Sequence, residues 1–229
     1  MTQTGKNKMV KMEKMLKSQY SIKDILVDVA LSIYDHDKNH ARDGEIFHSR
    51  LCLESLLPEN LKLLNLNSGH EAVTFPQEII RKHYSLNQHF RFDILESLGT
   101  GSISHTRGLA GFALCSKGFG IGLDLEWRDR PMKMTSQRLF KHDQDEDSFF
   151  LNEQTLLSLW CIKEAAFKAL SLDGAIQKTH EHPVLSHIYV RGNEFFHKFD
   201  QNLKGTLKQE VLENDGREFV LTLALKNEN

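Results

Sequence analysis

The segment from Trp160 to Leu170, WCIKEAAFKAL, constrains the fold most, because it predicts a helix with almost no polar face. Such a helix is buried, so other parts of the chain must cover it on several sides. Three charged residues nevertheless interrupt the apolar run: Lys163, Glu164 and Lys168. An unpaired buried charge is costly, so each of them needs a partner.

The spacing of apolar residues predicts two helices and one strand. The apolar segment above extends to a helix over residues 152–172, which Gly174 helps to end. A second helical pattern covers residues 40–57 and stops before Pro58. In residues 25–33 apolar side chains occupy every second position, which predicts a strand with one buried face.

Further strands are predicted in the middle and towards the end of the chain. Residues 102–115 and 119–127 flank the turn-forming residues 116–118 (SKG), and we expect two adjacent antiparallel strands there. Residues 214–216 (NDG) predict a second hairpin. These strands and helices mix without the regular alternation of a parallel sheet, so we expect an α+β fold with antiparallel sheets.

Composition restricts the class of protein. A chain of 229 residues with 40% hydrophobic residues suits one large domain or two small halves with a shared core. The net charge of -2 does not favour a nucleic-acid or membrane surface. Cys52, Cys115 and Cys161 lie far apart among apolar neighbours, as reduced thiols do. With no signal-peptide pattern or long apolar run visible, we expect a cytoplasmic protein.

The N-terminus is more basic than the rest of the chain. Five lysines fall between Lys6 and Lys17, and we expect residues 1–20 to form a flexible basic tail. The alternative is a docking strip for an acidic partner protein.

Two acidic residues in the segment GIGLDLE (120–126) indicate a metal site. In a strand, Asp124 and Glu126 project from one face, while Leu123 and Leu125 face the core. Mg²⁺ characteristically takes one or two carboxylates together with waters and substrate phosphates. The alternative is that both carboxylates face solvent at the end of a strand.

Two further elements can carry charge chemistry. Glu164 and Lys168 are four residues apart on one helix face, in the acid-first order that favours an ion pair, and an ordinary surface pair is the simpler interpretation. In the segment SISHT, His105 stands between the hydroxyls of Ser104 and Thr106, which favour anion binding. The alternative is a structural or solvated histidine.

Together these elements resemble the 4'-phosphopantetheinyl transferase superfamily. The chain has, in order, Ser-His-Thr, Gly-Leu-Asp-Leu-Glu and Trp-Cys-Ile-Lys-Glu-Ala-Ala-Phe-Lys. These match the family patterns S-H-[ST], G-[IV]-D-x-E and [FW]-[SCA]-x-K-E-[AS]-x-x-K, apart from the leucine where isoleucine or valine is common. The motifs span residues 102–170, and K-E-x-x-x-K is the most specific of them.

The resemblance implies a fold of two similar halves. Each half would be a small antiparallel sheet packed with a long helix, and the two would join as a pseudo-two-fold dimer within one chain. We expect an N-terminal half over residues 21–117 and a C-terminal half over residues 118–229 that carries the metal-binding motifs. At this length the chain resembles the larger, monomeric type of the superfamily.

The resemblance also implies a reaction. It is the transfer of the 4'-phosphopantetheine arm of coenzyme A to a serine of an apo acyl or peptidyl carrier protein, with Mg²⁺ and release of adenosine 3',5'-bisphosphate. Asp124, Glu126 and Glu164 would hold Mg²⁺, and Glu164 could also accept the proton of the serine. Lys168 would stabilise the charge on the phosphates. Neither nucleic acid nor a membrane is an expected partner.

Contacts with coenzyme A are implied for five residues. Ser104 and His105 match the family segment that helps to bind the 3'-phosphate. Arg42 and Arg50 lie where an early basic helix would reach the same phosphate. Lys163, one residue before the catalytic glutamate and about 100° around the helix, would meet the other end of coenzyme A or a carboxylate.

One usual phosphate contact has no counterpart in the chain. Many members carry Gly-Lys-Pro or a similar segment before the Ser-His pair, whereas HFRFDILESLGTG contains neither proline nor lysine. The contact therefore stays unassigned, with Arg91 as one candidate. Two alternatives to an active transferase stay open: a catalytically inactive coenzyme A- or carrier-binding member of the fold, and an unrelated Mg²⁺ phosphatase or nucleotidyl enzyme. Fatty-acid, polyketide, polyunsaturated-lipid and nonribosomal-peptide carriers all remain candidate partners.

Overall fold

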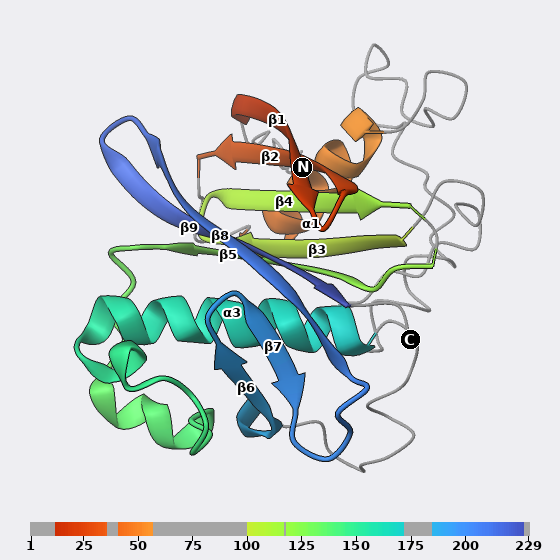
Figure 1. The fold of residues 1–229 in the computed structure, drawn as a ribbon. Helices are drawn as coiled ribbons and strands as arrows, with labels where there is room; N and C mark the ends of the chain where they lie inside the picture. The colour runs from red at the N-terminus through yellow and green to blue at the C-terminus, as the bar shows by residue number, and fades with distance from the viewer. Residues whose placement is uncertain (1–11, 36–40, 57–99, 117, 172–184, 227–229) are drawn as a thin grey trace, which may run out of the picture.

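The computed structural model describes residues 12–35, 41–56, 100–116, 118–171 and 185–226. Over these residues the chain is α+β, with two antiparallel sheets that lie against each other and a long helix packed on each (Figure 1). Within these ranges, no helix combines the length and the apolar composition needed to cross a membrane.

The first sheet has the strand order β1-β2-β4-β3, and all neighbouring strands are antiparallel. Its strands are β1 (Met12–Ile22), β2 (Ile25–Tyr34), β3 (Thr100–Thr106) and β4 (Leu109–Cys115). Helix α1 (Ala41–Leu56) packs on β2 and β4 and encloses a small core with them. The predictions of a strand over residues 25–33 and a helix over residues 40–57 are therefore confirmed.

Strand β1 corrects the prediction of a flexible tail. The predicted tail covers residues 1–20, but residues 12–20 pair with β2 along their length. Residues 1–11 lie outside the described residues. Tyr20 and Ile22 are buried between the sheets, and Leu16 packs against the same core. The lysines dominate the composition of this segment, but its alternate apolar residues decide its structure.

The second sheet has the order β5-β9-β8-β7-β6, again with antiparallel neighbours. Its strands are β5 (Ile121–Trp127), β6 (Ile188–Arg191), β7 (Glu194–His197), β8 (Lys204–Asn214) and β9 (Arg217–Lys226). Helix α3 (Glu153–Ser171) lies along β5 and β9, as Figure 1 shows, and confirms the predicted helix over residues 152–172. Three short 3-10 helices complete the described elements: η3 (Met134–Leu139), η4 (Asp147–Phe150) and η5 (Leu185–His187).

The middle of the chain folds differently from the predicted pair of strands. Residues 102–115 are not one strand, because the chain turns at Gly108, whose φ of 74° suits a glycine, and β3 and β4 form the hairpin. Strand β5 then leaves this sheet and pairs with β9, so the hairpin predicted around residues 116–118 is wrong. The chain therefore passes from one sheet to the other between β4 and β5.

The hairpin predicted at residues 214–216 is confirmed. It joins β8 to β9, and Asp215 and Gly216 have φ angles of 52° and 77°. Two successive residues with positive φ are what a two-residue turn between twisted antiparallel strands requires.

An apolar core fills the space between the two sheets. It includes alternate residues of β2, β4, β5 and β9, among them Leu123 and Leu125, which are 0% and 1% exposed. The sheets approach closely at Gly111 of β4, where an added Cβ would lie 2.6 Å from Leu125 Cδ1. The prediction that the leucines of GLDLE face the core is confirmed.

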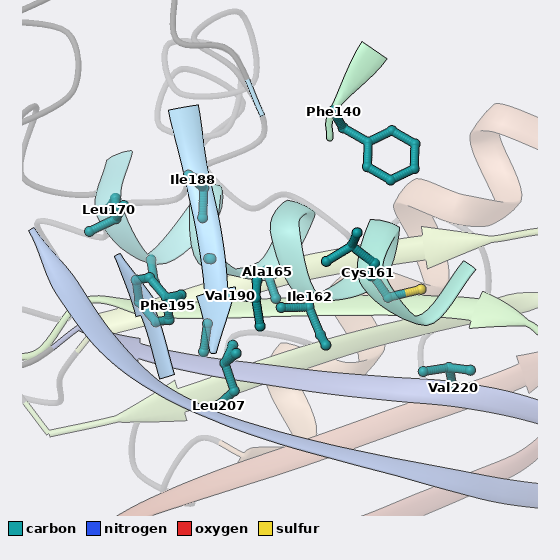
Figure 2. Packing of buried hydrophobic residues seen from close by; sticks show 14 of the residues in the cluster. Phe140, Cys161, Ile162, Ala165, Leu170, Ile188, Val190, Phe195, Leu207 and Val220 are labelled. Atoms are coloured by element: carbon teal, nitrogen blue, oxygen red, sulfur yellow. The ribbon is translucent and has the colours of Figure 1, made fainter. Parts of the chain in front are cut away.

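A second core lies between α3 and the other face of the second sheet. Figure 2 shows Ile162 and Ala165 of α3 beside the strands that carry Val190 and Leu207. Helix α3 can touch β5 because Gly122 has no side chain: an added Cβ would lie 1.8 Å from the carbonyl oxygen of Ala165. This close approach brings the charged residues of the helix against the acidic residues of the strand.

Candidate active site

A row of hydroxyl groups joins the two sheets. Strands β3 and β5 are the edges of their sheets and lie in contact. Ser102, Ser104 and Thr106 alternate along β3 and share one face, and we call them the hydroxyl row. Ser102 Oγ accepts the N–H of Leu123 at 2.9 Å, and Ser104 Oγ accepts the N–H of Leu125 at 3.1 Å. Ser102 and Ser104 thus accept hydrogen bonds from backbone N–H groups of β5, as carbonyl groups of a neighbouring strand do inside a sheet.

The same row contacts the two carboxylates of β5. Ser104 Oγ donates to Asp124 Oδ1 at 3.2 Å, and Thr106 Oγ1 donates to Glu126 Oε2 at 3.1 Å. Asp124 and Glu126 are only 6% and 8% exposed. The alternative that both carboxylates face solvent is therefore wrong.

Lys168 brings a positive charge from α3 into this group. Its Nζ donates to Asp124 Oδ1 at 3.0 Å and to the carbonyl oxygen of Leu123 at 2.8 Å, and the residue is 4% exposed. The simpler interpretation, an ordinary surface pair with Glu164, does not describe this lysine. It is a buried cation whose carboxylate partner lies on another element.

Glu164 and Arg130 lie beside these groups. Burial raises the pKa of Glu164, and the negative charge of Asp124 raises it further, while Lys168 and Arg130 oppose the shift. Arg130 also makes an ion pair with Glu126 Oε1, and 41% of its side chain is exposed. Glu164 is thus a half-buried carboxylate with an increased affinity for a proton.

His105 connects the group to helix α1. Its Nδ1 lies 3.3 Å from Oε2 of Glu45, and about a fifth of each side chain is exposed, 23% and 21%. Burial lowers the pKa of His105, Glu45 and Asp124 act to raise it, and Lys168 acts to lower it. The histidine is therefore within electrostatic reach of both sheets and both helices.

We call these residues the candidate site: Glu45, Ser104, His105, Thr106, Asp124, Glu126, Arg130, Glu164 and Lys168. Six of them were predicted as site residues, and the structure brings these six together: Ser104, His105, Asp124, Glu126, Glu164 and Lys168. They come from β3, β5 and α3, which are not consecutive elements of the chain.

Lys163 lies outside the candidate site, in a fully buried ion pair, so its predicted contact with coenzyme A is corrected. Its side chain is 0% exposed, and Nζ donates to Asp145 Oδ2 at 2.6 Å, to Phe140 O at 2.6 Å and to Ile188 O at 2.7 Å. An ammonium group has three N–H donors, and all three are used. Of the two partners predicted for Lys163, the structure has the carboxylate.

The three arginines predicted as phosphate contacts remain predictions. Arg42 lies in the first turn of α1, and its side chain is outside the described residues, as is the whole of Arg91. Arg50 lies further along α1 with a half-buried side chain. The α1 residue with a described contact in the candidate site is Glu45.

The candidate site has the charge and the chemistry to bind a cation. Its carboxylates outnumber its permanent cations, Arg130 and Lys168. Asp124 Oδ2 is buried and has no hydrogen-bond partner in the described part of the chain, which costs free energy unless a cation or donor binds there. Asp124 and Glu164 therefore fit Mg²⁺, which needs only one or two carboxylates.

In this arrangement the protein's own cations hold the acidic groups. No cluster of three or more His, Cys, Asp or Glu side chains suited to a metal is found among the described residues. Both oxygens of Glu126 are in use, one by Arg130 and one by Thr106. For Glu126 to bind a metal through Oε1, Arg130 must move away.

Three residues of the candidate site were missing from the predicted site. Thr106 follows the Ser-His pair and repeats the spacing of the carboxylates, which is a signal that the sequence contains. Arg130 lies four residues after Glu126, in an irregular segment without a pattern. Glu45 could not be selected, because the rotation of α1 against the sheet depends on packing.

Comparisons with known proteins do not assign the chain to a class, so its function must be argued from the candidate site. No protein-family model matches the chain, and no curated protein is significantly similar to it.

Proposed function

We propose that the chain is a 4'-phosphopantetheinyl transferase, which moves the phosphopantetheine arm of coenzyme A to a serine of an apo acyl or peptidyl carrier protein. One observation carries the proposal. Ser104 and Lys168, from two of the three motifs, donate to the same oxygen, Asp124 Oδ1, which belongs to the third. Motifs that resemble one family in sequence thus meet at one atom.

The architecture supports the same proposal. Each sheet carries one long helix, and the chain passes from the first sheet to the second between β4 and β5. We propose that these two units are the two similar halves of the monomeric type. The first begins with β1 at Met12 and not at the expected residue 21, and the second covers the expected residues 118–229. The candidate site lies where their edge strands meet. A cytoplasmic location belongs to the same proposal.

The cation expected in the site is Mg²⁺. Asp124 and Glu164 would hold it, and Glu126 could join them once Arg130 leaves it. When bound, Mg²⁺ would neutralise charge on the diphosphate of coenzyme A. The ammonium of Lys168, which contacts Asp124 Oδ1 at 3.0 Å, would stabilise negative charge that develops on the phosphate oxygens.

Glu164 acts as the base in this proposal. The serine oxygen of the carrier protein forms a bond to the phosphorus next to pantetheine, and the bond from that phosphorus to the bridging oxygen breaks. Adenosine 3',5'-bisphosphate leaves with the bridging oxygen. The serine proton passes to the carboxylate of Glu164, whose raised pKa favours accepting it. His105 is expected to reach the 3'-phosphate.

The test is a mass measurement on the carrier protein. The chain is incubated with coenzyme A, Mg²⁺ and each of several apo carriers, and we expect a mass increase of one phosphopantetheine group. Glu164→Gln should reduce the rate by at least about 100-fold, as loss of a general base does. Glu153→Gln is the matched control, because Glu153 is an exposed carboxylate in the first turn of the same helix.

The same experiment separates the alternatives. Coenzyme A binding without a mass shift on any carrier would favour the inactive, binding-only member. Turnover of phosphate esters that lack pantetheine would favour an unrelated Mg²⁺ phosphatase. Equal rates for Glu164→Gln and Glu153→Gln would refute the role given to Glu164.

A further inference from the structure

The hydrogen bonds of Ser104 indicate a role other than the contact with the 3'-phosphate of coenzyme A that the family resemblance implies. The residue is 5% exposed, and its oxygen accepts the N–H of Leu125 at 3.1 Å. A hydroxyl has one proton to donate, and Ser104 donates it in the hydrogen bond to Asp124 Oδ1 at 3.2 Å. With its proton used inside the protein, the hydroxyl has none left to donate to a phosphate of coenzyme A.

The consequence of this bond lies at Asp124. Its Oδ1 accepts from both Ser104 and Lys168, at 3.2 Å and 3.0 Å, and two donors on one oxygen fix the rotation of the carboxylate. The other oxygen, Oδ2, is buried and has no N–H or O–H donor among the described residues, although the buried thiol of Cys161 interacts with the same carboxylate. The carboxylate is thus held by one oxygen and keeps the other for a cation.

Thr106 repeats the arrangement two residues further along β3. Its Oγ1 donates to Oε2 of Glu126 at 3.1 Å, and Oε1 is the oxygen that meets Arg130. One oxygen of each carboxylate therefore contacts the hydroxyl row. The other oxygen contacts Arg130 in Glu126 and has no such contact in Asp124. The two-residue period of both strands keeps the pairs in register.

We propose that Ser104 and Thr106 are positioning residues, which hold Asp124 and Glu126 so that one oxygen of each carboxylate is presented to a divalent cation, and that Ser104 does not contact coenzyme A. The inference rests on the proposed function for the role of that cation, but it concerns the cation site alone. It can therefore be tested with the metal and without any carrier protein.

The first experiment measures Mn²⁺ binding to the full chain by electron paramagnetic resonance, without coenzyme A. Ser104→Ala and the near-isosteric Thr106→Val should each weaken Mn²⁺ binding by about tenfold or more, as loss of a group that orients a metal ligand does. Ser102→Ala is the matched control, because Ser102 is 1% exposed and accepts the N–H of Leu123, but its described bond goes to no carboxylate. It should bind Mn²⁺ within about twofold of the unchanged chain.

Thermal unfolding of Ser102→Ala and Ser104→Ala accompanies the titration, since both variants lose an equivalent bond to β5. Unchanged Mn²⁺ affinity in Ser104→Ala and Thr106→Val would overturn the inference, as would equal losses in all three variants. If Ser104→Ala does not fold, Thr106→Val decides alone, because its shape is preserved.

The second experiment compares coenzyme A with 3'-dephospho-coenzyme A as substrates. A positioning role predicts that Ser104→Ala lowers kcat by the same factor with both and leaves the KM for coenzyme A within about twofold. A defect confined to KM, and absent with the dephosphorylated substrate, would show that Ser104 binds the 3'-phosphate and would overturn the inference. A chain that binds Mn²⁺ as predicted but modifies no carrier would refute the proposed function alone.

Discussion

Replacing Lys163 by methionine tests the buried ion pair that holds α3 in place. The substitution keeps an unbranched apolar stem but removes the ammonium, which is fully buried and donates to Asp145, Phe140 and Ile188. Asp145 keeps two donors, the N–H groups of His142 and Val190, at 2.8 Å and 3.0 Å. Its negative charge, however, stays buried without a cation.

The expected loss follows from this geometry. Removing one partner of a buried ion pair typically costs about 3–5 kcal/mol, because the other charge is left uncompensated. The carbonyl groups of Phe140 and Ile188 also lose their donor, and this loss is already included in the figure of about 3–5 kcal/mol. For a chain of this size, about 1 kcal/mol changes Tm by about 2–4 °C, so Lys163→Met should lower Tm by about 6–20 °C.

The assay is urea unfolding followed by circular dichroism, with thermal unfolding beside it. Lys133→Met is the control, since Lys133 is an exposed lysine on the segment that follows β5, and it should change stability by less than about 0.5 kcal/mol. The double variant Lys163→Met with Asp145→Asn should lose less than the sum of the single losses. A loss below about 1 kcal/mol, or a raised KM for coenzyme A at unchanged stability, would refute the reasoning.

Three further predictions concern stability. Burial lowers the pKa of His48 from 6.5 to about 4, so the unfolded chain takes up a proton below pH 6.5 that the folded chain does not. The free energy of unfolding should therefore fall by about 3 kcal/mol between pH 6.5 and 4, and His48→Phe should remove this slope. Gly122→Ala should cost more than about 3 kcal/mol, because its Cβ would meet the carbonyl oxygen of Ala165 at 1.8 Å. Asn152→Ala should cost about 1 kcal/mol, because its side chain accepts two N–H groups at the start of α3, both at 2.9 Å.

Each of these predictions has a result that contradicts it. Unfolding curves at several pH values that keep the same slope in His48→Phe would exclude this histidine as the cause. For Gly122→Ala the comparison is Gly192→Ala, which has no atom within 4 Å of the new Cβ and a φ of 57°; the inference about close packing fails if both cost the same. A change in Tm below about 1 °C for Asn152→Ala would show that the cap is not needed.

The sequence predicts those features that depend on local spacing. The charges inside WCIKEAAFKAL required buried partners, and Lys163 and Lys168 both have them. The period of two placed Asp124 and Glu126 on one face, opposite the leucines of the core. In these cases the geometry of a single helix or strand decides the outcome.

The features that the sequence does not predict depend on contacts between distant segments. Asp145, the partner of Lys163, lies in the irregular segment after β5, whose path follows no period. Glu45 reaches His105 only because of how α1 is rotated on its sheet. The pairing of β5 with β9 could not be read from β5, because a strand's own pattern specifies its buried face and not its neighbour.

The pairing of β5 with β9 also affects when the candidate site can form on the ribosome. Asp124 lies opposite Thr222, and Glu126 lies opposite Val220, so β5 has no partner strand until most of the chain has been synthesised. Such non-local pairing slows folding. A nascent chain that ends before β9 can complete the first sheet and α1, while the edge of β5 that pairs with β9 and the part of the apolar core that β9 covers stay exposed. Such a chain is prone to aggregation and a target for chaperones.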